Sequence, residues 1–445
     1  MRNLYSLFAV PTLAKQLKQT VGQASMCFVK MLLATMFMIT VVSVKLFAQA
    51  PVIGYNSPQI YTVNSAITPL SPTGSGVAAP AYSSTLVSLG AGFSSPGSVA
   101  TDAAGNVYVA DEGHNQVKKI PVGGGSTLII GTGFLKPSGV AVDAAGNVYV
   151  ADSGNGVVKK IPAGGGAIVT LNPGSGASPV AVAVDVAGNV YEADAANADV
   201  VEIPVSGAAA FSLGSFTPAP TGVAVDAAGN VYVAGGPGGL NEIPAGGGAP
   251  VILGSEFTTP YGVAADAAGN VYVADAGSNT IWQLAAGGST PVAINSGFNN
   301  PTGVAIDRKG NIYVADKGNN AVKKIAPVGG YYIGPFLPAG LSFNNTTGVI
   351  SGTPTAVSAT ANYTITAYNN NGSSSATVSI TISANNTNLT NLVLSTGTLS
   401  PAFASGTKSY TASLSSPVTS VMVAEGSDDV GVSVIEVVEA GTVAV

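Results

Sequence analysis

Aspartates recur at fixed places in the middle of this 445-residue chain, and their spacing could support chemistry. Each of six Gly-Asn-(Val/Ile)-Tyr segments has an aspartate three residues before its Gly, and five of the six have another five residues after the Asn. Regularly spaced carboxylates can bind a metal ion, transfer protons or cap turns. The first set is Asp102, Asp143, Asp185, Asp226, Asp266 and Asp307, and the second set is Asp111, Asp152, Asp194, Asp275 and Asp316.

Repetition separates structural candidates from functional ones. A residue that nearly every copy repeats is expected to be scaffold, whereas a residue that differs between copies is a better candidate for function. The first aspartate set is therefore interpreted as structural, because Asp-x-x-Gly-Asn suits a tight hairpin that the carboxylate caps. Its similarity to a calcium loop is weak, since the required ring of carboxylates is missing. The second set either caps turns or contacts a ligand, and Gly235 replaces it in the fourth copy.

Other catalytic side chains are scarce. His114 is the only histidine, so a histidine-rich zinc site cannot form. Cys27, the only cysteine, lies before an apolar run and would be removed with a leader, and no Gly-x-Ser-x-Gly elbow is present. We expect His114 to be a solvated loop residue that replaces Ser153 or Gly318 of the sister copies. The sequence predicts no metal site, no cofactor and no enzymatic activity.

The unit that carries these aspartates recurs at intervals of 40 to 42 residues. Each copy has four short runs rich in Val, Ile and Tyr, separated by Gly, Asn, Asp and Pro turns, which predicts four strands and no helix. Four strands per unit of about 40 residues is the pattern of a β-propeller blade. The units are centred on Gly105, Gly146, Gly188, Gly229, Gly269 and Gly310.

The sequence motif of the unit is specific to one kind of repeat. Pro-x-Gly-Val-Ala-Val-Asp-x-x-Gly-Asn-(Val/Ile)-Tyr-Val-Ala-Asp-x-Gly-Asn, as in Pro137–Asn155, closely resembles the NHL repeat. The resemblance covers residues 84–328 and implies a six-bladed β-propeller, a fold often used for binding, with the second aspartate set on its usual binding face. The sixth copy ends at Pro327 without an outer strand, whereas an orphan strand, Ser84–Gly90, precedes the first copy. We expect this orphan to complete the last blade and close the ring.

The flanks of the repeats resemble a second kind of domain. Gly-Leu-Ser-Phe and Gly-Val-Ile-Ser-Gly-Thr-Pro, within residues 340–354, resemble the Ig-like domain of bacterial surface proteins. The opening pattern of that family appears instead at Tyr61–Pro72, on the far side of the repeats, with Asn64 in place of the usual Gly. We therefore expect the propeller to be inserted between residues 51–83 and 329–384 of one β-sandwich.

The two ends of the chain differ in composition from the repeats and from each other. Residues 1–50 have five basic residues, no acidic one, an apolar run at Met31–Val44 and a small-x-small site at Ala50, so they are interpreted as a signal peptide. Cleavage would leave 11 basic residues against 22 acidic ones, which disfavours nucleic acid and anionic membranes as partners. No later membrane span is expected. Residues 385–445 begin with a linker, and Leu392–Phe403 resembles part of a bacterial cadherin-like β-sandwich.

Positions where the copies disagree are the candidates for specificity. Besides the second aspartate set they are His114, Glu192, Gly235, Tyr261 and Trp282, and Trp282 is the only tryptophan. Paired lysines lie on the third strands of three copies that become neighbours when the ring closes. They are either solvated edges that block strand pairing or a docking surface for an anionic glycan or a protein. The pairs are Lys118 and Lys119, Lys159 and Lys160, and Lys323 and Lys324.

These patterns predict an all-β protein, a six-bladed β-propeller inserted in an Ig-like β-sandwich, with a partial C-terminal β-sandwich. We expect a monomeric, secreted or cell-surface protein that binds an unknown protein or glycan on the loop face of the propeller. Two alternatives stay open. One is a metal-dependent lyase or lactonase of the six-bladed type, with Asp and Asn holding the metal at the channel mouth. The other is a structural fragment of a longer adhesin.

Overall fold

The computed structural model describes residues 49–172, 177–235, 239–254 and 256–384, and six short strands beyond residue 391. In these residues all regular structure is strand except three 3₁₀ turns, η2 (Glu112–His114), η3 (Ser153–Asn155) and η4 (Lys317–Asn319). The predicted all-β fold of the propeller type is confirmed. The predicted leader lies outside the described residues apart from its last two positions. Within the described residues, no helix has the length and apolar character needed to cross a membrane.

The repeat region forms six four-stranded antiparallel sheets, blades 1 to 6, within the described residues. Their innermost strands are β6 (Pro96–Thr101), β10 (Pro137–Val142), β14 (Pro179–Val184), β18 (Pro220–Val225), β22 (Pro260–Ala265) and β26 (Pro301–Ile306). The second strands are β7 (Val107–Asp111), β11 (Val148–Asp152), β15 (Val190–Asp194), β19 (Val231–Gly235), β23 (Val271–Asp275) and β27 (Ile312–Asp316). The third strands are β8 (Gln116–Ile120), β12 (Val157–Ile161), β16 (Asp199–Ile203), β20 (Gly239–Ile243), β24 (Thr280–Leu284) and β28 (Ala321–Ile325). The outer strands are β9 (Leu128–Gly131), β13 (Val169–Asn172), β17 (Phe211–Ser215), β21 (Val251–Gly254), β25 (Val292–Asn295) and β5 (Val87–Leu89).

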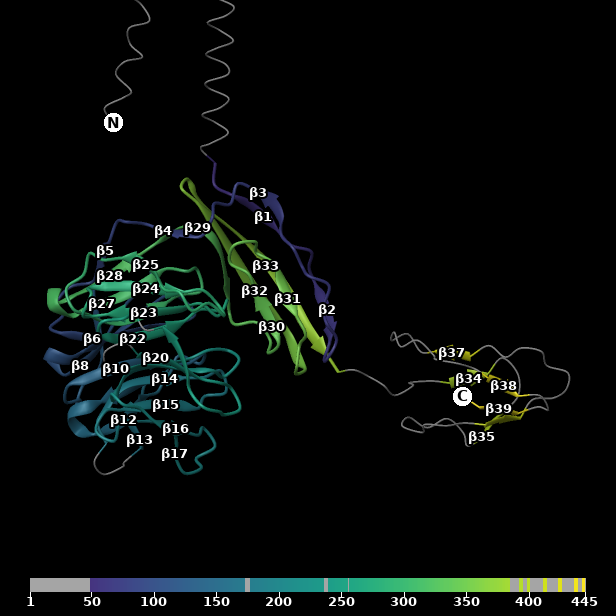
Figure 1. The fold of residues 1–445 in the computed structure, drawn as a ribbon, viewed down its shortest axis with the longest axis horizontal. Coiled ribbons are helices and arrows are strands. Elements are labelled where there is room, and N and C mark those ends of the chain that lie inside the picture. Colours follow the sequence, from purple (N-terminus) through teal and green to yellow (C-terminus); the bar gives the residue numbers. More distant parts are fainter. Residues whose placement is uncertain are drawn as a thin grey trace, which may run out of the picture.

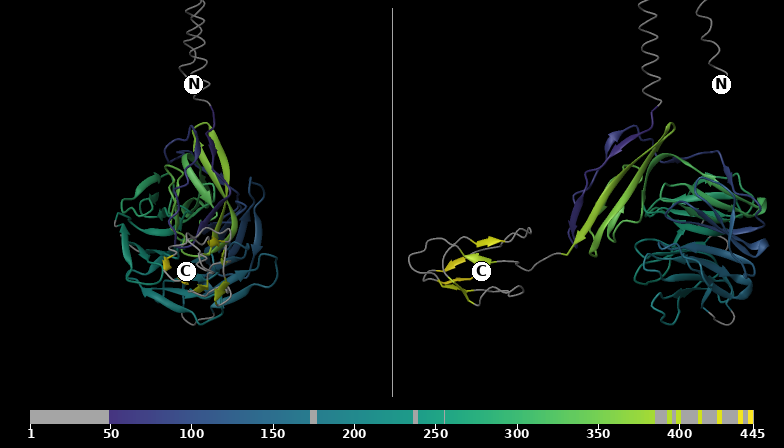
Figure 2. Two further views of the ribbon diagram at one scale, coloured as in Figure 1. Left: turned by 90° about the vertical axis from the view of Figure 1, so that its right-hand side faces the viewer. Right: turned by 180° about the vertical axis from the view of Figure 1, so that it is seen from behind.

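The blades close into a ring. Each innermost strand contacts the next, and β26 of blade 6 contacts β6 of blade 1. Figure 2 shows the sheets arranged around a common axis. The outer strand of blade 6 is β5, which pairs with β28 in the register Val87 with Lys324 and Leu89 with Val322. The predicted latch is confirmed, and it covers an edge that would otherwise be free to pair with another chain.

Apolar side chains fill the spaces between neighbouring blades. The second strands are buried along their whole length, since both of their faces lie against adjacent sheets. Between blades 1 and 2, Phe134 packs with Tyr108 and Val117 on one side and with Val140 and Val150 on the other. Phe134 therefore fills the space between two blades.

Both flanks of the propeller contribute strands to one five-stranded sheet. β2 pairs in parallel with β33, and β4 pairs with β29. Strands that precede the propeller in the sequence therefore pair with strands that follow it. This shared sheet is what an inserted propeller requires, and two separate sheets would have contradicted the insertion. In order, the sheet contains β2 (Gln59–Thr62), β33 (Gly372–Ser383), β32 (Ser358–Asn369), β29 (Pro327–Gly334) and β4 (Ala81–Tyr82). Two small sheets accompany it, β1 (Val52–Gly54) with β3 (Thr73–Ser75) and β30 (Leu341–Phe343) with β31 (Ile350–Gly352).

The sandwich lies against one end of the ring (Figures 1 and 2). The Tyr82 and Tyr272 hydroxyls are 2.8 Å apart, and the Tyr368 hydroxyl donates to the Lys309 carbonyl at 2.9 Å. Ala268 of blade 5 packs against the apolar core of the sandwich. These contacts leave the opposite end of the ring uncovered by the sandwich.

The C-terminal segment is described only as short strands. They form a pair and a four-stranded sheet, and most of residues 385–445 lies outside the described residues. The cadherin-like resemblance of this segment therefore stays a prediction. The pair is β34 (Leu392–Leu394) with β37 (Val423–Glu425), and the sheet contains β35 (Thr398–Ser400), β36 (Thr411–Ser413), β39 (Thr442–Ala444) and β38 (Glu436–Val438).

Candidate functional site

The axis of the ring has two mouths. All innermost strands run in the same direction along the axis, so they begin at one mouth and end at the other. A cavity of about 420 Å³ lies where they begin, and we call this end the open mouth. A cavity of about 260 Å³ lies where they end, against residues 331–336 of the sandwich, and we call this end the capped mouth.

A β-bulge shapes the open mouth in every blade. Each innermost strand shifts register between its Pro and the residue two positions later. A bulge redirects side chains and is common beside binding sites. The middle residue of each bulge lines the cavity, and its identity varies around the ring. These six positions, which we call the bulge residues, are Gly97, Ser138, Val180, Thr221, Tyr261 and Thr302.

The bulge hydroxyls connect neighbouring blades. Ser138 Oγ donates to the Val180 carbonyl of the next blade at 2.8 Å. Thr221 Oγ1 donates to the Pro260 carbonyl at 2.8 Å. These bonds use the hydroxyl protons, and Ser138 Oγ also lies 2.5 Å from Ser153 Oγ. The remaining lone pairs of the Ser138 and Thr221 oxygens can accept hydrogen bonds from a ligand.

Among the bulge residues, Tyr261 presents an aromatic ring and a hydroxyl group to the cavity. It is 38% exposed, and its hydroxyl makes no hydrogen bond to a described residue. Blade 5, which carries Tyr261, lies opposite blade 2 in the ring, and blade 2 contributes Lys136, Ser138 and Ser153 to the same cavity. An aromatic ring therefore faces a cationic and hydroxyl-bearing wall across the open mouth.

Charges at the open mouth are concentrated on blades 6, 1 and 2. Lys317 of blade 6 and Glu112 of blade 1 form an ion pair of 2.5 Å across the seam where the ring closes. Lys136 is exposed, and its backbone N–H is held by Asn115 Oδ1 at 2.7 Å. No carboxylate of the described residues pairs with the Lys136 ammonium. One cation is therefore available to a ligand, whereas the other is already neutralised.

The second aspartate set is not available to a ligand, and its interpretation as a binding set is wrong. Its five members are 0–2% exposed. One oxygen of each accepts a backbone N–H from the loop before the innermost strand, as Asp152 does from Leu135 at 2.7 Å. The second oxygen is also bonded, for Asp152 by Asn155 at 2.8 Å. The carboxylates cap turns, and burial requires them to have these partners. The members are Asp111, Asp152, Asp194, Asp275 and Asp316.

His114 has the same structural role as amides in other blades. Its Nδ1 lies 2.8 Å from Asp111 Oδ2, which is the contact that Asn155 and Asn319 make in blades 2 and 6. It therefore corresponds to these asparagines. The expectation from the sequence, that it replaces Ser153 or Gly318, is wrong. Its side chain is 47% exposed, in agreement with a solvated loop position.

Three of the six paired lysines are counter-ions for buried carboxylates. Lys159 Nζ lies 2.7 Å from Asp152 and 5.4 Å from the centre of the Phe134 ring. Lys118 and Lys323 repeat this arrangement with their own Asp and Phe partners. The prediction of a free charged docking surface is therefore wrong for these three. The other three extend over tyrosine rings at 5.1–5.8 Å and are Lys119, Lys160 and Lys324.

Trp282 replaces a lysine in the core of blade 5. It lies opposite Val273 in the strand register, as Lys118 lies opposite Val109 in blade 1. Its ring meets Phe257 edge to face at 6.4 Å. The aromatic contact substitutes for the lysine–phenylalanine contact of blades 1, 2 and 6. Trp282 is only partly buried, so its role as a ligand-binding residue stays a prediction. Glu192, in contrast, is buried in β15.

The first aspartate set lines the capped mouth and is scaffold, as predicted. In all six blades one oxygen accepts the backbone N–H of the Asn four residues later, at 2.8–2.9 Å. The other accepts that Asn Nδ2 at 2.7–2.8 Å. It also accepts the Tyr hydroxyl six residues later, at 2.9–3.2 Å. We call this unit the Asp–Asn–Tyr triad.

The triads differ in their electrostatics because the sandwich covers only part of the ring. Burial alone would raise the pKa of Asp143, but hydrogen bonds from Asn147 and Tyr149 and the nearby Lys160 outweigh it and lower that pKa. Asp266 lies under the sandwich. Burial raises its pKa, and the same kinds of hydrogen bond offset this only in part.

Sequence reasoning missed several mouth residues. Of the bulge residues it selected only Tyr261, although the second position of every Pro-x-Gly motif varies. It also missed Arg308, the one basic residue in the first position after the triad aspartates. The described residues contain no group of three or more His, Cys, Asp and Glu placed to hold a metal ion.

Comparison with protein-family models identifies both domain types in the chain. NHL repeats match residues 93–120, 134–161 and 298–325, and a model described as "Putative Ig domain" matches residues 327–383. The chain therefore contains NHL repeats and an Ig-type domain, as the sequence motifs suggested.

Several solved propeller structures are similar to this chain at low sequence identity. The gluconolactonase XC5397 from Xanthomonas campestris has a TM-score of 0.49 at 14% identity, over 60% of this chain and 98% of that one. Virginiamycin B lyase from Staphylococcus aureus has a TM-score of 0.42 at 14% identity, over 62% and 94%. A chain of a nidogen/laminin complex has a TM-score of 0.43 at 19% identity, over 47% and 85%. No curated protein sequence matches this chain.

Proposed function

We propose that this protein is an extracellular, non-enzymatic binding protein that docks its ligand at the open mouth of the propeller. One observation carries the proposal. The bulge residues at the open mouth differ from blade to blade, whereas the capped mouth repeats the Asp–Asn–Tyr triad in every blade. A ring of similar blades does not need five different residue types at the six equivalent positions of one mouth, so the variation at the open mouth is attributed to ligand recognition.

The open mouth combines the groups that bind a polar ligand with a flat apolar face. Tyr261 offers a ring and a free hydroxyl, and Lys136 offers a positive charge. The oxygens of Ser138 and Thr221 can accept hydrogen bonds. The cavity of about 420 Å³ falls within the range of small-molecule sites. A sugar ring with an acidic substituent, or an acidic loop of a partner protein, matches these groups.

Two observations support a location outside the cytoplasm. An Ig-type domain is matched at residues 327–383, and the pattern of residues 1–50 predicts a signal peptide. Support for a non-enzymatic role comes from the carboxylates. The second aspartate set is buried, and the first set is bonded within its own turns. Neither set is placed as a free acid or base at the open mouth.

The proposal is tested by binding of the full chain to an array of neutral and acidic glycans, with a parallel pull-down of extracellular proteins. Tyr261→Ala and Lys136→Gln are expected to lower retention of the captured ligand at least about tenfold. Lys309→Gln, which removes an exposed charge at the opposite end of the ring, is the matched control and should retain it. Equal retention by all variants would contradict docking at the open mouth. Stoichiometric calcium or zinc in the purified protein would favour the metal-dependent alternative.

A further inference from the structure

The capped mouth contains one side chain that breaks the repeat. The residue after the triad aspartate is small or aliphatic in five blades, and in blade 6 it is Arg308. The corresponding residues are Ala103, Ala144, Val186, Ala227 and Ala267. The ring closes without an arginine in five blades, so Arg308 is not a requirement of the fold.

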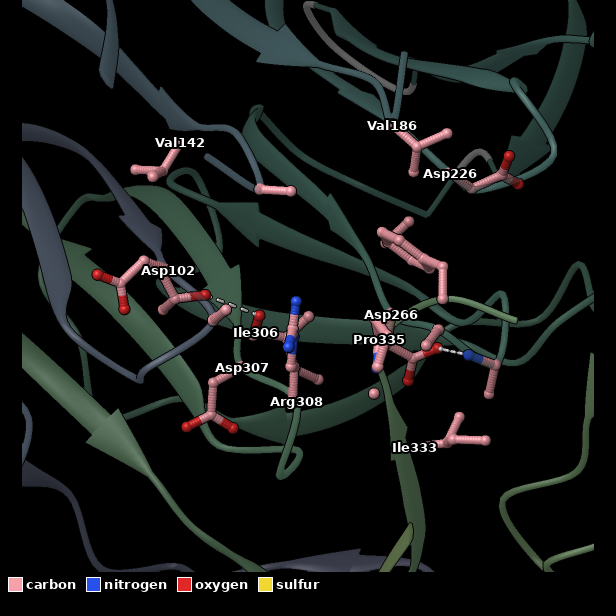
Figure 3. Close-up of a pocket in the computed structure, with 18 of the residues that line it drawn as sticks. Asp102, Val142, Val186, Asp226, Asp266, Ile306, Asp307, Arg308, Ile333 and Pro335 are labelled. Atoms are coloured by element: carbon pink, nitrogen blue, oxygen red, sulfur yellow. Dashed lines mark hydrogen bonds between the residues drawn. The ribbon is translucent and has the colours of Figure 1, made fainter. Parts of the chain in front are cut away.

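Arg308 extends into the capped cavity. Figure 3 shows its guanidinium reaching toward the centre, whereas the carboxylates of Asp102, Asp226 and Asp307 turn away toward their own loops. Each of these carboxylates is already bonded by the Asn and Tyr of its triad. The guanidinium makes no hydrogen bond or ion pair with any described residue. Its charge is therefore available to a molecule in the cavity.

The stem of Arg308 is held in place by the sandwich. A Cβ on Gly334 of β29 would lie 2.4 Å from Arg308 Cβ and 2.5 Å from its Cγ, so only glycine allows this close approach. The stem contacts this strand on one side, and the residue as a whole remains exposed. A guanidinium held in this way loses less side-chain entropy when it binds a planar oxyanion.

Charges behind the triads divide the capped mouth into two halves. The third-strand residue that pairs with the triad tyrosine is a lysine in blades 6, 1 and 2, next to Arg308. It is Glu202 in blade 3 and Glu242 in blade 4, on the opposite side of the ring. Burial and the neighbouring triad aspartate raise the pKa of each of these glutamates. In blades 6, 1 and 2 the lysines therefore offset the negative charge of the triad aspartates. In blades 3 and 4 the glutamates add to it.

We propose that the capped cavity binds a free α-amino acid, with its carboxylate on Arg308 and its ammonium on the side of blades 3 and 4, where no lysine offsets the negative charge of the triad aspartates. A simple anion would meet a ring of six aspartates, and a simple cation would be repelled by Arg308. A zwitterion matches both halves. The cavity of about 260 Å³ is below the usual range for drug-sized ligands, and Val142, Val184 and Phe336 provide apolar wall for a side chain.

The test is isothermal titration calorimetry of the full chain against each of the common L-α-amino acids. At least one is expected to bind with a Kd below about 1 mM. Its N-acetyl and its carboxamide derivatives should each bind at least about tenfold more weakly, because each lacks one of the two charges. The proposal is overturned if no amino acid binds at this level, or if both derivatives bind as tightly as the amino acid from which they are made.

Variants locate the site. Arg308→Gln should abolish binding, and Arg308→Lys should weaken it, because lysine keeps the charge but loses the bidentate geometry. Lys309→Gln removes the neighbouring exposed charge and should leave the affinity unchanged. A thermal scan checks that each variant folds. Unchanged affinity of Arg308→Gln would contradict the assignment. Tyr261→Ala at the open mouth should leave amino-acid binding unchanged, so this proposal and the proposed function can fail separately.

Discussion

The two mouths of the ring are built from the same strands, but residues are repeated at one mouth and varied at the other. At the capped mouth each strand ends in the same Asp–Asn–Tyr triad, with nearly identical bond lengths in all six blades. At the open mouth each strand begins with a bulge whose middle residue differs, from Gly97 to Tyr261. Identical residues solve a problem that every blade shares, which is how to turn between its first two strands. Differing residues have no such shared task, so recognition is expected where the blades differ.

The largest effect on stability is expected from removing a triad carboxylate. Asp143→Ala leaves the Asn147 N–H, the Asn147 side-chain amide and the Tyr149 hydroxyl without their acceptor. A partly buried charged acceptor with three donors contributes about 3 kcal/mol. Differential scanning calorimetry should show a lower Tm, while ligand retention at the open mouth stays as in the parent. Loss of retention without loss of stability would reverse the roles of the two mouths.

The pH dependence of two triads should have opposite signs. Asp143 has a lowered pKa, so the stability it contributes is present above the ordinary value of 3.8 and is lost as the pH falls through its lower folded pKa. Asp266 has a raised pKa, so its effect is more favourable at low pH and is lost as the pH rises through its folded pKa.

Calorimetry of Asp143→Asn and Asp266→Asn between pH 2 and 7 distinguishes the two cases, at about 2–4 °C in Tm per kcal/mol. The parent should lose its advantage over Asp143→Asn as the pH falls. It should gain relative to Asp266→Asn over the same range. The same sign for both variants would contradict the account of burial under the sandwich.

A smaller effect is expected from the bonds that connect blades at the open mouth. Ser138→Ala removes the hydrogen bond to the Val180 carbonyl of the next blade. One such bond contributes about 1 kcal/mol. Ser84→Ala, in the segment before the latch strand, is a control that deletes an exposed hydroxyl with no hydrogen bond to a described residue. A decrease in Tm for Ser138→Ala that exceeds that of Asp143→Ala would mean that the bulges carry more of the stability than the triads.

The smallest effect on stability is expected at the residue with the largest effect on binding. Tyr261→Ala removes a partly exposed side chain whose hydroxyl bonds to no described residue. The free energy of unfolding should change by less than about 0.5 kcal/mol. Circular dichroism melts should superimpose on those of the parent, while ligand retention falls. A change in Tm as large as that of Asp143→Ala would place Tyr261 with the scaffold.

The sequence predicted the repeated parts of this molecule well. The period predicted the sheets, and the missing outer strand placed the latch within Ser84–Gly90, where the structure has β5 (Val87–Leu89). The Tyr61–Pro72 pattern indicated strands shared by both flanks. These features depend on turn chemistry and strand periodicity, which are local properties. The role of the first aspartate set followed from its position in a tight turn.

The sequence was less informative about side chains whose role depends on neighbouring blades. Asp152 looked accessible because it opens a loop, but the preceding loop buries it and Lys159 neutralises it. Trp282 looked like a ligand platform because it is unique, but it fills a lysine position beside Phe257. Arg308 could have been found, since it breaks an Ala-rich turn, whereas its position beneath β29 requires knowing where the sandwich lies.

Site-specific photo-crosslinking tests the central claim most directly. A photoreactive phenylalanine analogue is placed at position 261 of the open mouth or at position 103 of the capped mouth, and the full chain is irradiated with the ligand recovered from the glycan or protein screen. The account predicts a covalent adduct from position 261 and none from position 103. An adduct from position 103 alone would contradict docking at the open mouth.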